Sequence, residues 1–236
     1  MEFEFLKNRE DLGNIDIAKE WRVILTSQEI EKCVQKCADY INNNFKGKKI
    51  IMTCILKGAV YFLADLTRKL IIPHSCYFIE SSSYKDKQVQ DEKVEILSKI
   101  IPSKFADREV ILIDELFDNG TTLNYVKNAI HEQGNVPLDK IFTCTLFKKS
   151  RDYSLTCTNN NTDIQCAKSP DLIGIEVPDI WLVGYGLDDC QEKRGWTYLF
   201  ACPKAPDVSK TKDDIIFEND EIYKQMRIKI LSEIPK

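Results

Sequence analysis

Apolar runs and stretches of helical spacing follow one another along the chain, and together they predict alternating strands and helices. Four short apolar runs suit buried strands, at residues 49–55, 76–80, 110–113 and 141–147. Apolar residues at helical spacing predict helices before and between them. The first begins at about residue 27 and is ended by Asn42-Asn43-Asn44 and Gly47, and the others cover about residues 60–70 and 123–134. Thr26 or Ser27 can cap the first helix, and Gly134 marks an end for the last. This order favours βαβ units, and therefore an α/β fold built on a mainly parallel sheet.

The two ends of the chain are less regular than its middle. Residues 1–26 are mixed in composition and predict no element. A further strand is expected over residues 197–202, and residues 150–170 indicate a polar surface excursion. The charged tail can form a helix over residues 221–234, with one apolar face made of Ile222, Met226, Ile230 and Ile234. The sequence leaves open whether that helix packs on the body of the protein or on a partner subunit.

Composition narrows the class of protein. A chain of 236 residues with 43% hydrophobic content can bury one good core, and nothing requires a second domain. The net charge of −4 predicts no polyanion-binding surface, so we expect no nucleic-acid partner. Nine cysteines without a C-x-x-C pattern and two histidines favour reduced thiols in the cytoplasm over disulfides or a zinc site. No signal peptide is present and the apolar runs are too short for a bilayer, so no membrane partner is expected.

The most informative stretch begins with the predicted strand at residues 110–113. Two carboxylates, Asp114 and Glu115, follow it directly, at the edge where open α/β sheets hold their ligands. Neighbouring residues of a strand point to opposite faces, so both carboxylates reach one ligand only if the strand ends there. A short loop then leads into the helix through Asp118 and residues 119–122.

That loop has the features of a phosphate cradle. A helix N-terminus presents unpaired N–H groups, and its dipole favours an anion. Gly120 permits a positive φ and close approach, while the side chains of Asn119, Thr121 and Thr122 can donate hydrogen bonds. Carboxylates beside a phosphate repel it unless they bind sugar hydroxyls or a divalent cation placed between. The plainer interpretation is a solvated strand end with Asp118 as a capping residue, but the full order of residues favours the phosphate site.

The stretch resembles the phosphoribosyl-pyrophosphate motif of the type I phosphoribosyltransferases, and the chain as a whole is most similar to their hypoxanthine-guanine branch. The resemblance covers about residues 23–202. It implies a type I phosphoribosyltransferase fold, with a mainly parallel twisted sheet flanked by helices and a small hood from N- and C-terminal segments. We expect one domain over residues 1–236, divided into a core (27–150), a hood and nucleobase segment (1–26 and 170–203) and a tail (204–236).

The resemblance implies a reaction and assigns the central residues to it. A 5-phosphoribosyl group would pass from phosphoribosyl pyrophosphate to N9 of hypoxanthine or guanine, giving IMP or GMP and pyrophosphate, with Mg²⁺ as cofactor. Asp118 would be the catalytic residue, as general base or proton partner at the purine N7. Asp114 and Glu115 would bind the ribose hydroxyls and the metal. The 5′-phosphate would be held by Asn119, Gly120, Thr121 and Thr122.

Two further segments match the pyrophosphate side of such a site. Lys57 and Gly58, with Arg194, would bind pyrophosphate, and in the family the peptide between this lysine and glycine is typically cis. Without the family, Lys57-Gly58 indicates only a turn. Ser83 and Tyr84 match the family's active-site loop, within a polar stretch that shows no strand or helix periodicity.

The purine side is expected after the strand at 141–147 and in the segment 172–188. By resemblance, Lys148 would bind the 6-oxo group, Trp181 would stack on the base and Leu182 would offer backbone contacts. Asp188 would contact the purine side or the metal. Lys149, one residue out of register, is expected to be solvated. Taken singly, Trp181 is more typical of a core aromatic.

Three departures from the family pattern stand out. The acidic pair runs Asp114-Glu115 instead of glutamate then aspartate, and Asn119 replaces a common threonine or serine. Thr121 replaces a common lysine, which predicts weaker binding of the ribosyl donor. Alternatives are a phosphoribosyltransferase for xanthine or a pyrimidine, a non-catalytic sensor of the ribosyl donor, and a generic nucleotide-binding domain. The resemblance also implies a homodimer or homotetramer.

Overall fold

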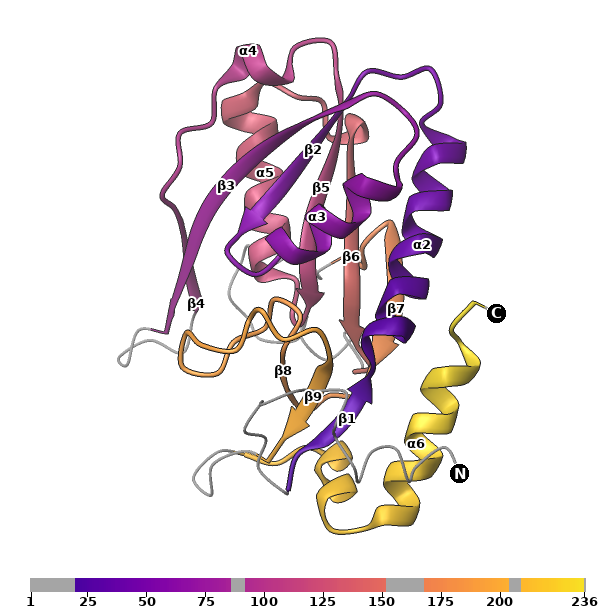
Figure 1. Cartoon of the computed structure of the whole chain (residues 1–236). Coiled ribbons are helices and arrows are strands. Elements are labelled where there is room, and N and C mark those ends of the chain that lie inside the picture. Colours follow the sequence, from indigo (N-terminus) through magenta and orange to yellow (C-terminus); the bar gives the residue numbers. More distant parts are fainter. Residues whose placement is uncertain (1–19, 86–91, 152–167, 204–208, 236) are drawn as a thin grey trace.

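The computed structural model describes residues 20–85, 92–151, 168–203 and 209–235. Within these residues the chain forms a six-stranded sheet, a three-stranded sheet and helices around them (Figure 1). No helix in this part of the chain is long and apolar enough to cross a membrane.

The larger sheet confirms the predicted mainly parallel architecture. Its strands lie in the order β4-β3-β2-β5-β6-β7, and all neighbours are parallel except β3 and β4. The strands are β2 (Ile50–Leu56), β3 (His74–Lys85), β4 (Glu92–Ile96), β5 (Glu109–Phe117), β6 (Ile141–Lys149) and β7 (Leu172–Val177). Strand β7 was not predicted, although it lies in the segment assigned by resemblance to the purine site.

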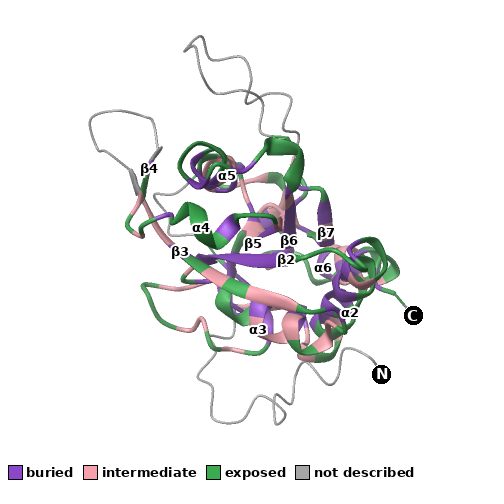
Figure 2. Cartoon of the chain, turned by 90° about the horizontal axis from the view of Figure 1, so that it is seen from above, coloured by how far each residue is buried: buried purple, intermediate pink, exposed green. Residues whose placement is uncertain are grey.

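Helices cover both faces of this sheet, as Figure 2 shows from above. One face carries α2 (Ser27–Asn44) and α3 (Val60–Lys69), and the other carries α4 (Pro102–Phe105) and α5 (Thr121–Gly134). Successive residues of β5 divide between the two cores: Val110 and Leu112 pack with α5, whereas Ile111 and Ile113 pack with α2 and α3. Because both faces are buried, the strands are continuous apolar runs without alternation. A short 3₁₀ turn, η2 (Leu138–Lys140), precedes β6.

The first helix begins where the sequence allowed. Thr26 is its N-cap: the Thr26 side chain accepts a hydrogen bond from the Glu29 N–H, and the Glu29 carboxylate accepts one from the Thr26 N–H. The helix ends at Asn44, within the stretch that was expected to end it.

The smaller sheet forms a hood on the side where the parallel strands end (Figure 1). Its strands are β1 (Arg22–Leu25), β8 (Trp181–Val183) and β9 (Leu199–Cys202), antiparallel in the order β1-β9-β8. Ile24, Leu25 and Leu199 on one face join the main core, while Val23, Phe200 and nearby aromatic rings pack together on the other. Strand β1 lies in a stretch that predicted no element, because its partner comes from a distant part of the chain.

The C-terminal segment packs on the body of the protein, which answers the question that the sequence left open. It contains the 3₁₀ helix η4 (Lys212–Phe217) and α6 (Asp220–Ser232). Tyr223 donates a hydrogen bond to the Val23 carbonyl at 2.7 Å. Arg227 is buried and donates to the Ile24 carbonyl at 2.5 Å and to both carboxylate oxygens of Glu29. Helix α6 thus ties the hood strand β1 to the start of α2.

One expectation about irregular segments is corrected. The polar stretch after residue 80 begins as a strand. Strand β3 continues to Lys85 and pairs with β4 from Ser81↔Ile96 to Lys85↔Glu92. Backbone pairing, which polar side chains do not prevent, extends these strands. Most of the expected excursion at 150–170 lies outside the described residues.

We expect Arg227→Gln to destabilise the fold. The variant leaves the buried Ile24 carbonyl without its donor and Glu29 without its cation, which costs about 1–3 kcal/mol of unfolding free energy. Thermal melting should show this as a drop of several degrees. Arg68→Gln is the control, because its pair with Asp65 is exposed and worth at most about 1 kcal/mol. Equal losses in both variants would contradict the assignment.

Candidate active site

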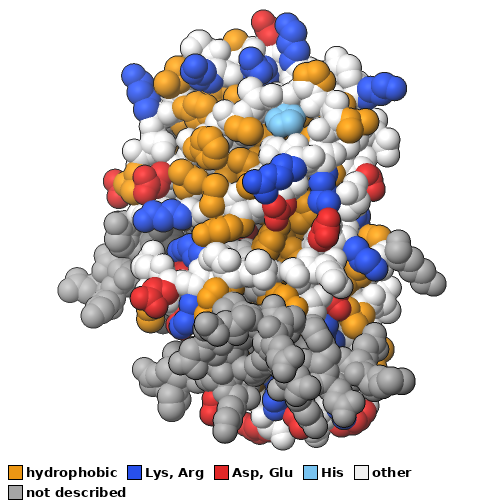
Figure 3. Space-filling view, viewed as in Figure 1, with side chains coloured by type: hydrophobic (Ala, Val, Ile, Leu, Met, Phe, Trp, Pro, Cys, Tyr) orange, Lys and Arg blue, Asp and Glu red, His pale blue; other side chains and the backbone are white. Residues whose placement is uncertain are grey.

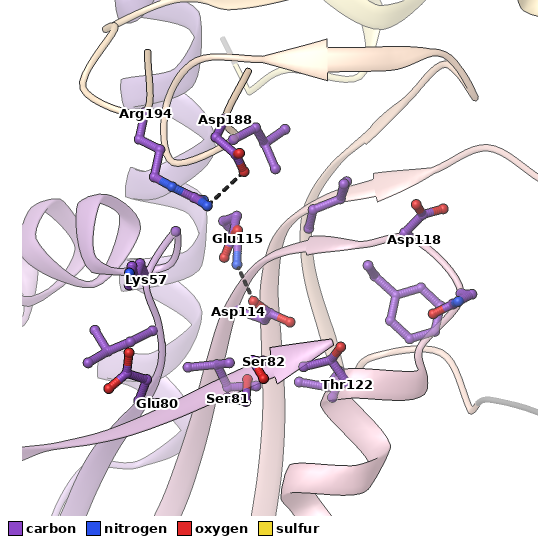
Figure 4. Close-up of a pocket in the computed structure, with 18 of the residues that line it drawn as sticks. Lys57, Glu80, Ser81, Ser82, Asp114, Glu115, Asp118, Thr122, Asp188 and Arg194 are labelled. Carbon is purple, nitrogen blue, oxygen red and sulfur yellow. Dashed lines mark hydrogen bonds and ion pairs between the residues drawn. The ribbon is translucent and has the colours of Figure 1, made fainter. Parts of the chain in front are cut away.

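A cavity of about 620 Å³ lies between the ends of β2, β3 and β5 and the loop that follows β8 (Figure 4). This volume is typical of sites for small ligands. Its lining contains most of the expected site residues, namely Lys57, Gly58, Asp114, Glu115, Asp118, Asn119, Gly120, Thr122, Asp188 and Arg194. The structure therefore brings together expected residues from three separate segments of the chain, at 57–58, 114–122 and 188–194.

The two central carboxylates reach the cavity for a reason that differs from the expected one. Strand β5 does not end at Asp114 but continues to Phe117. Its pairing with β2 stops at Cys54↔Ile113, whereas its pairing with β6 goes on. Beyond Ile113 the β2 edge of the strand is therefore open, and both Asp114 and Glu115 line the space beside it.

Three segments meet closely at Glu115. A Cβ atom added to Gly58 would lie 1.9 Å from the Glu115 Oε1 atom and 2.8 Å from the Gly186 carbonyl oxygen. A Cβ atom on Gly186, which has a φ of +101°, would lie 2.5 Å from the Gly58 carbonyl oxygen. Only glycine fits at both positions. The loop after β2 is thereby packed against the strand that carries the carboxylates.

The cis peptide of this loop lies one residue earlier than the resemblance implied. It joins Leu56 and Lys57, at the end of β2, and not Lys57 and Gly58. The expected position is therefore wrong, although the loop itself forms part of the cavity wall.

The surroundings of Asp114 and Glu115 shift the pKa values of both carboxyl groups. Burial raises the pKa of Asp114 well above its usual value, and the adjacent negative charge of Glu115 raises it further. Burial also raises the pKa of Glu115, against opposing effects of its hydrogen bond with Asp114 and of the Arg194 guanidinium. The pair therefore holds a proton more readily than two separate carboxylates do.

The carboxylates of Asp114 and Glu115 fit Mg²⁺ better than a metal ion that is held by protein ligands alone. In the described part of the chain, no group of three or more His, Cys, Asp or Glu side chains is arranged to hold a metal ion. Mg²⁺ prefers oxygen ligands and takes only one or two carboxylates, completing its shell with water and substrate oxygens. Asp114 and Glu115 are such carboxylates, and a nearby cation would offset their repulsion.

The loop before α5 has the backbone that the sequence predicted. Gly120 is its N-cap residue with a φ of +82°, in the left-handed region that favours glycine. The Asn119 side chain acts as an acceptor, since its Oδ1 takes the Thr121 N–H at 3.0 Å. Thr122 lines the cavity, whereas Thr121 does not line it.

Asp188 and Arg194 form an ion pair at the hood side of the cavity (Figure 4). The Arg194 Nη2 atom lies 2.7 Å from Asp188 Oδ1, and Arg194 Nη1 donates to the Gly186 carbonyl at 2.8 Å. The Gln191 N–H donates to the other Asp188 oxygen at 2.9 Å. Asp188 therefore orients Arg194 toward the cavity.

The two neighbouring lysines of β6 are placed opposite to expectation. Lys148 does not line the cavity and pairs with Glu176 at 2.8 Å. Lys149, expected to be solvated, is only 8% exposed and lies 3.3 Å from Asp118 Oδ2. Adjacent strand residues point to opposite faces, so only one lysine can face Asp118.

The remaining purine-side residues are placed only in part. Trp181 is 49% exposed on β8, so it is not a core aromatic, and Leu182 beside it is buried. Neither lines the cavity described above. The side chains of Ser83 and Tyr84 lie outside the described residues, although their backbone belongs to β3.

Several site residues were missed by the sequence interpretation. Glu80, Ser82 and Gln191 line the cavity, and Arg151 and Asp179 surround Asp118 together with Lys149. Their signal in the sequence is weak, because each is a single polar residue whose direction is fixed only by the folded chain.

We expect Gly58→Ala to disrupt the cavity wall. The added methyl group would overlap the Gly186 carbonyl, which is backbone and cannot move alone, so the loss should be about 1–3 kcal/mol. Gly195→Ala is the matched control, since its Cβ would meet nothing closer than the Tyr61 hydroxyl at 3.6 Å. Chemical denaturation of both variants checks this, and an unchanged stability of Gly58→Ala would contradict the packing.

We expect Asp114→Asn to stabilise the protein in a pH-dependent way. The folded pKa of Asp114 is raised above its usual 3.8, so the wild type loses stability as pH rises through the folded pKa. An asparagine cannot ionise and escapes this loss. Melting temperatures without Mg²⁺ or substrate should converge near pH 4 and diverge in favour of the variant at higher pH. The control Asp139→Asn, at an exposed position, should show no such divergence. If the melting-temperature difference between Asp114→Asn and wild type stays constant with pH, ionisation of the buried Asp114 is not its cause.

Comparison with known proteins matches these features. Residues 20–169 match the model of the phosphoribosyl transferase domain family. The hypoxanthine phosphoribosyltransferase of Buchnera aphidicola subsp. Schizaphis graminum is 28% identical over 75% of this chain and 93% of that protein. The hypoxanthine-guanine phosphoribosyltransferase of Bacillus subtilis strain 168 is 27% identical over 75% and 91%.

A solved structure shows the same fold. The hypoxanthine phosphoribosyltransferase from Trypanosoma cruzi, in complex with the product IMP, aligns with a TM-score of 0.61 at 22% identity. The alignment covers 83% of this chain and 100% of that one. The family match spans well over half of the sequence and includes the carboxylate pair and the loop before α5. The chain therefore belongs to the phosphoribosyl transferase domain family.

Proposed function

We propose that this protein is a purine salvage enzyme. It transfers the 5-phosphoribosyl group of phosphoribosyl pyrophosphate to N9 of hypoxanthine or guanine, and it releases pyrophosphate with IMP or GMP. The observation that carries this proposal is the convergence, in one cavity, of an anion-binding helix start, an acidic pair and two cationic side chains. The relatives named as hypoxanthine and hypoxanthine-guanine phosphoribosyltransferases support the same activity.

Each part of the donor has matching chemistry in the cavity. The start of α5, from Gly120 to Thr122, suits the 5′-phosphate, because its N–H groups and dipole favour an anion. Asp114 and Glu115 suit the ribose hydroxyls, which can donate to buried carboxylates. Lys57 and Arg194 suit the pyrophosphate, whose charge grows as it leaves.

Mg²⁺ is the proposed cofactor, and the carboxylates of Asp114 and Glu115 would hold it at this end of the cavity. When bound, it supplies positive charge that stabilises the departing pyrophosphate. Asp188 reaches this region from the hood, and because it pairs with Arg194 we assign it first to orienting that arginine. A contact of Asp188 with the metal or with the purine side remains a proposal.

The base is proposed to lie between Asp118 and the hood. Asp118 would accept the proton of purine N7 as N9 attacks the ribose. The geometry favours Lys149 over Lys148 as the donor to the 6-oxo group, because Lys149 lies beside Asp118. Trp181, with its exposed ring, would stack on the purine, and Leu182 would offer its backbone. Ser83 and Tyr84 are kept as the proposed active-site loop.

The assembly and location are also proposals. Figure 3 shows apolar side chains gathered over α3 and β3, and exposed residues there include Val60, Tyr61 and Phe78. Such a surface supports a homodimer or homotetramer. The seven described cysteines are all free thiols, which supports a reducing compartment such as the cytoplasm.

The test is product formation from phosphoribosyl pyrophosphate and Mg²⁺ with hypoxanthine, guanine, xanthine, adenine and uracil offered in parallel. We expect turnover of the 6-oxopurines hypoxanthine and guanine. Asp118→Ala should lower kcat by about 10²- to 10⁴-fold, because it removes the proton acceptor. Turnover of another base alone would change the proposed substrate. Binding of the donor without turnover of any base would favour a sensor.

The two lysines of β6 provide a matched pair of variants within this assay. Lys149→Met should lower kcat/KM for hypoxanthine by about 10- to 100-fold, since a hydrogen bond from a charged donor is worth about 1.5–3 kcal/mol. Lys148→Met should retain most of the activity, because Lys148 faces Glu176. If Lys148→Met loses activity and Lys149→Met retains it, Lys148 is the donor to the 6-oxo group, as expected from the sequence.

A further inference from the structure

The Asp118 carboxylate is flanked by two cations, neither of which was expected there from the sequence. Arg151 Nη1 lies 2.7 Å from the buried Asp118 Oδ1, an ion pair without hydrogen-bond geometry, while Lys149 Nζ donates a hydrogen bond to Asp118 Oδ2 at 3.3 Å. The other terminal nitrogen of Arg151, Nη2, donates to Asp179 Oδ1. A single guanidinium therefore bridges the carboxylates of Asp118 and Asp179.

Asp179 is itself held by the C-terminal segment. Its backbone N–H donates to the Asp213 carboxylate at 2.8 Å, and the Thr211 hydroxyl donates to its carbonyl at 2.5 Å. Thr211 and Asp213 lie at the start of η4, beyond the residues that match the family model. A continuous set of contacts thus runs from η4 through Asp179 and Arg151 to Asp118.

We propose that Arg151 is a positioning residue for Asp118, a conclusion that rests on the proposed function. It fixes Oδ1 of the carboxylate and leaves Oδ2, on the Lys149 side, as the oxygen that faces the base. When Lys149 turns to the purine 6-oxo group, Oδ2 receives the proton from N7. At the same time N9 bonds to C1′ of the ribose, and the pyrophosphate leaves with the electron pair of the broken C1′–O bond.

The type of side chain supports this role. The planar guanidinium of arginine can bridge two carboxylates in a fixed geometry, whereas the ammonium group of lysine is a mobile point charge. Lys149 lies 3.3 Å from Asp118 and 3.7 Å from Asp179, both longer than the 2.7 Å between Arg151 and Asp118. A positioned proton acceptor depends on such support, because a displacement of about 1 Å can cost a factor of about 100 in rate.

The test compares Arg151→Gln and Arg151→Lys in the transfer assay with wild type. Arg151→Gln should lower kcat on the order of 10- to 100-fold while the KM for phosphoribosyl pyrophosphate stays the same. Arg151→Lys should recover part of kcat, because it keeps the charge but loses the bridge. Arg68→Gln, which removes an exposed arginine paired with Asp65, should behave as wild type.

A second measurement does not depend on turnover. Melting temperatures of Arg151→Gln, Asp118→Asn and the double variant should be non-additive, because each single change already removes the ion pair. A wild-type kcat in Arg151→Gln, a loss confined to the donor KM, or additive melting shifts would each overturn the proposal. Absence of transfer by the wild type would instead refute the proposed function, so the two failures are distinct.

Discussion

The contact between Glu115, Gly58 and Gly186 is the constraint on which the candidate site depends. Gly58 follows β2, Glu115 lies on β5 and Gly186 follows the hood strand β8, so this contact joins the two sheets. Because Gly58 and Gly186 have no Cβ atom, their backbone segments can pack more closely around the Glu115 carboxylate than any other residue would permit. The cavity walls are thereby set relative to one another before any ligand arrives. A rigid anion pocket of this kind loses little entropy on binding.

The same packing has an electrostatic cost. Burial next to Glu115 raises the pKa of Asp114, so the ionised pair destabilises the fold where both carboxylates are charged. A protein selected only for stability would replace such a pair with neutral residues of similar size. An acidic pair buried beside the unpaired edge of β5 is therefore typical of a site in which a ligand or cation supplies the compensating positive charge. Arg194, fixed by Asp188, offsets part of the cost from the hood side.

The sequence was sufficient for the features that depend on local pattern. The capped start of α2, the buried strands and the left-handed Gly120 before α5 all follow from residue type and spacing. It was insufficient where distant segments decide the result. Strand β1 forms because β9 pairs with it, and the choice between Lys148 and Lys149 depends on which face of β6 meets Asp118. In a sheet covered on both faces, burial and hydrophobic pattern do not reveal that choice.

The two ends of the site therefore differ in how far they are prepared for a substrate. At the proposed ribose and pyrophosphate end, tight backbone packing and a paired Arg194 hold the geometry. At the proposed base end, both oxygens of Asp118 already contact cations, so on the proposed mechanism a purine delivers its proton only after one cation moves. We propose that Lys149 is the cation that moves, since its ion pairs with Asp118 and Asp179 are longer than that of Arg151 with Asp118 and the 6-oxo group offers it a new partner. Recognition of a 6-oxopurine and release of the proton acceptor would then be one event, which links base selection to catalysis.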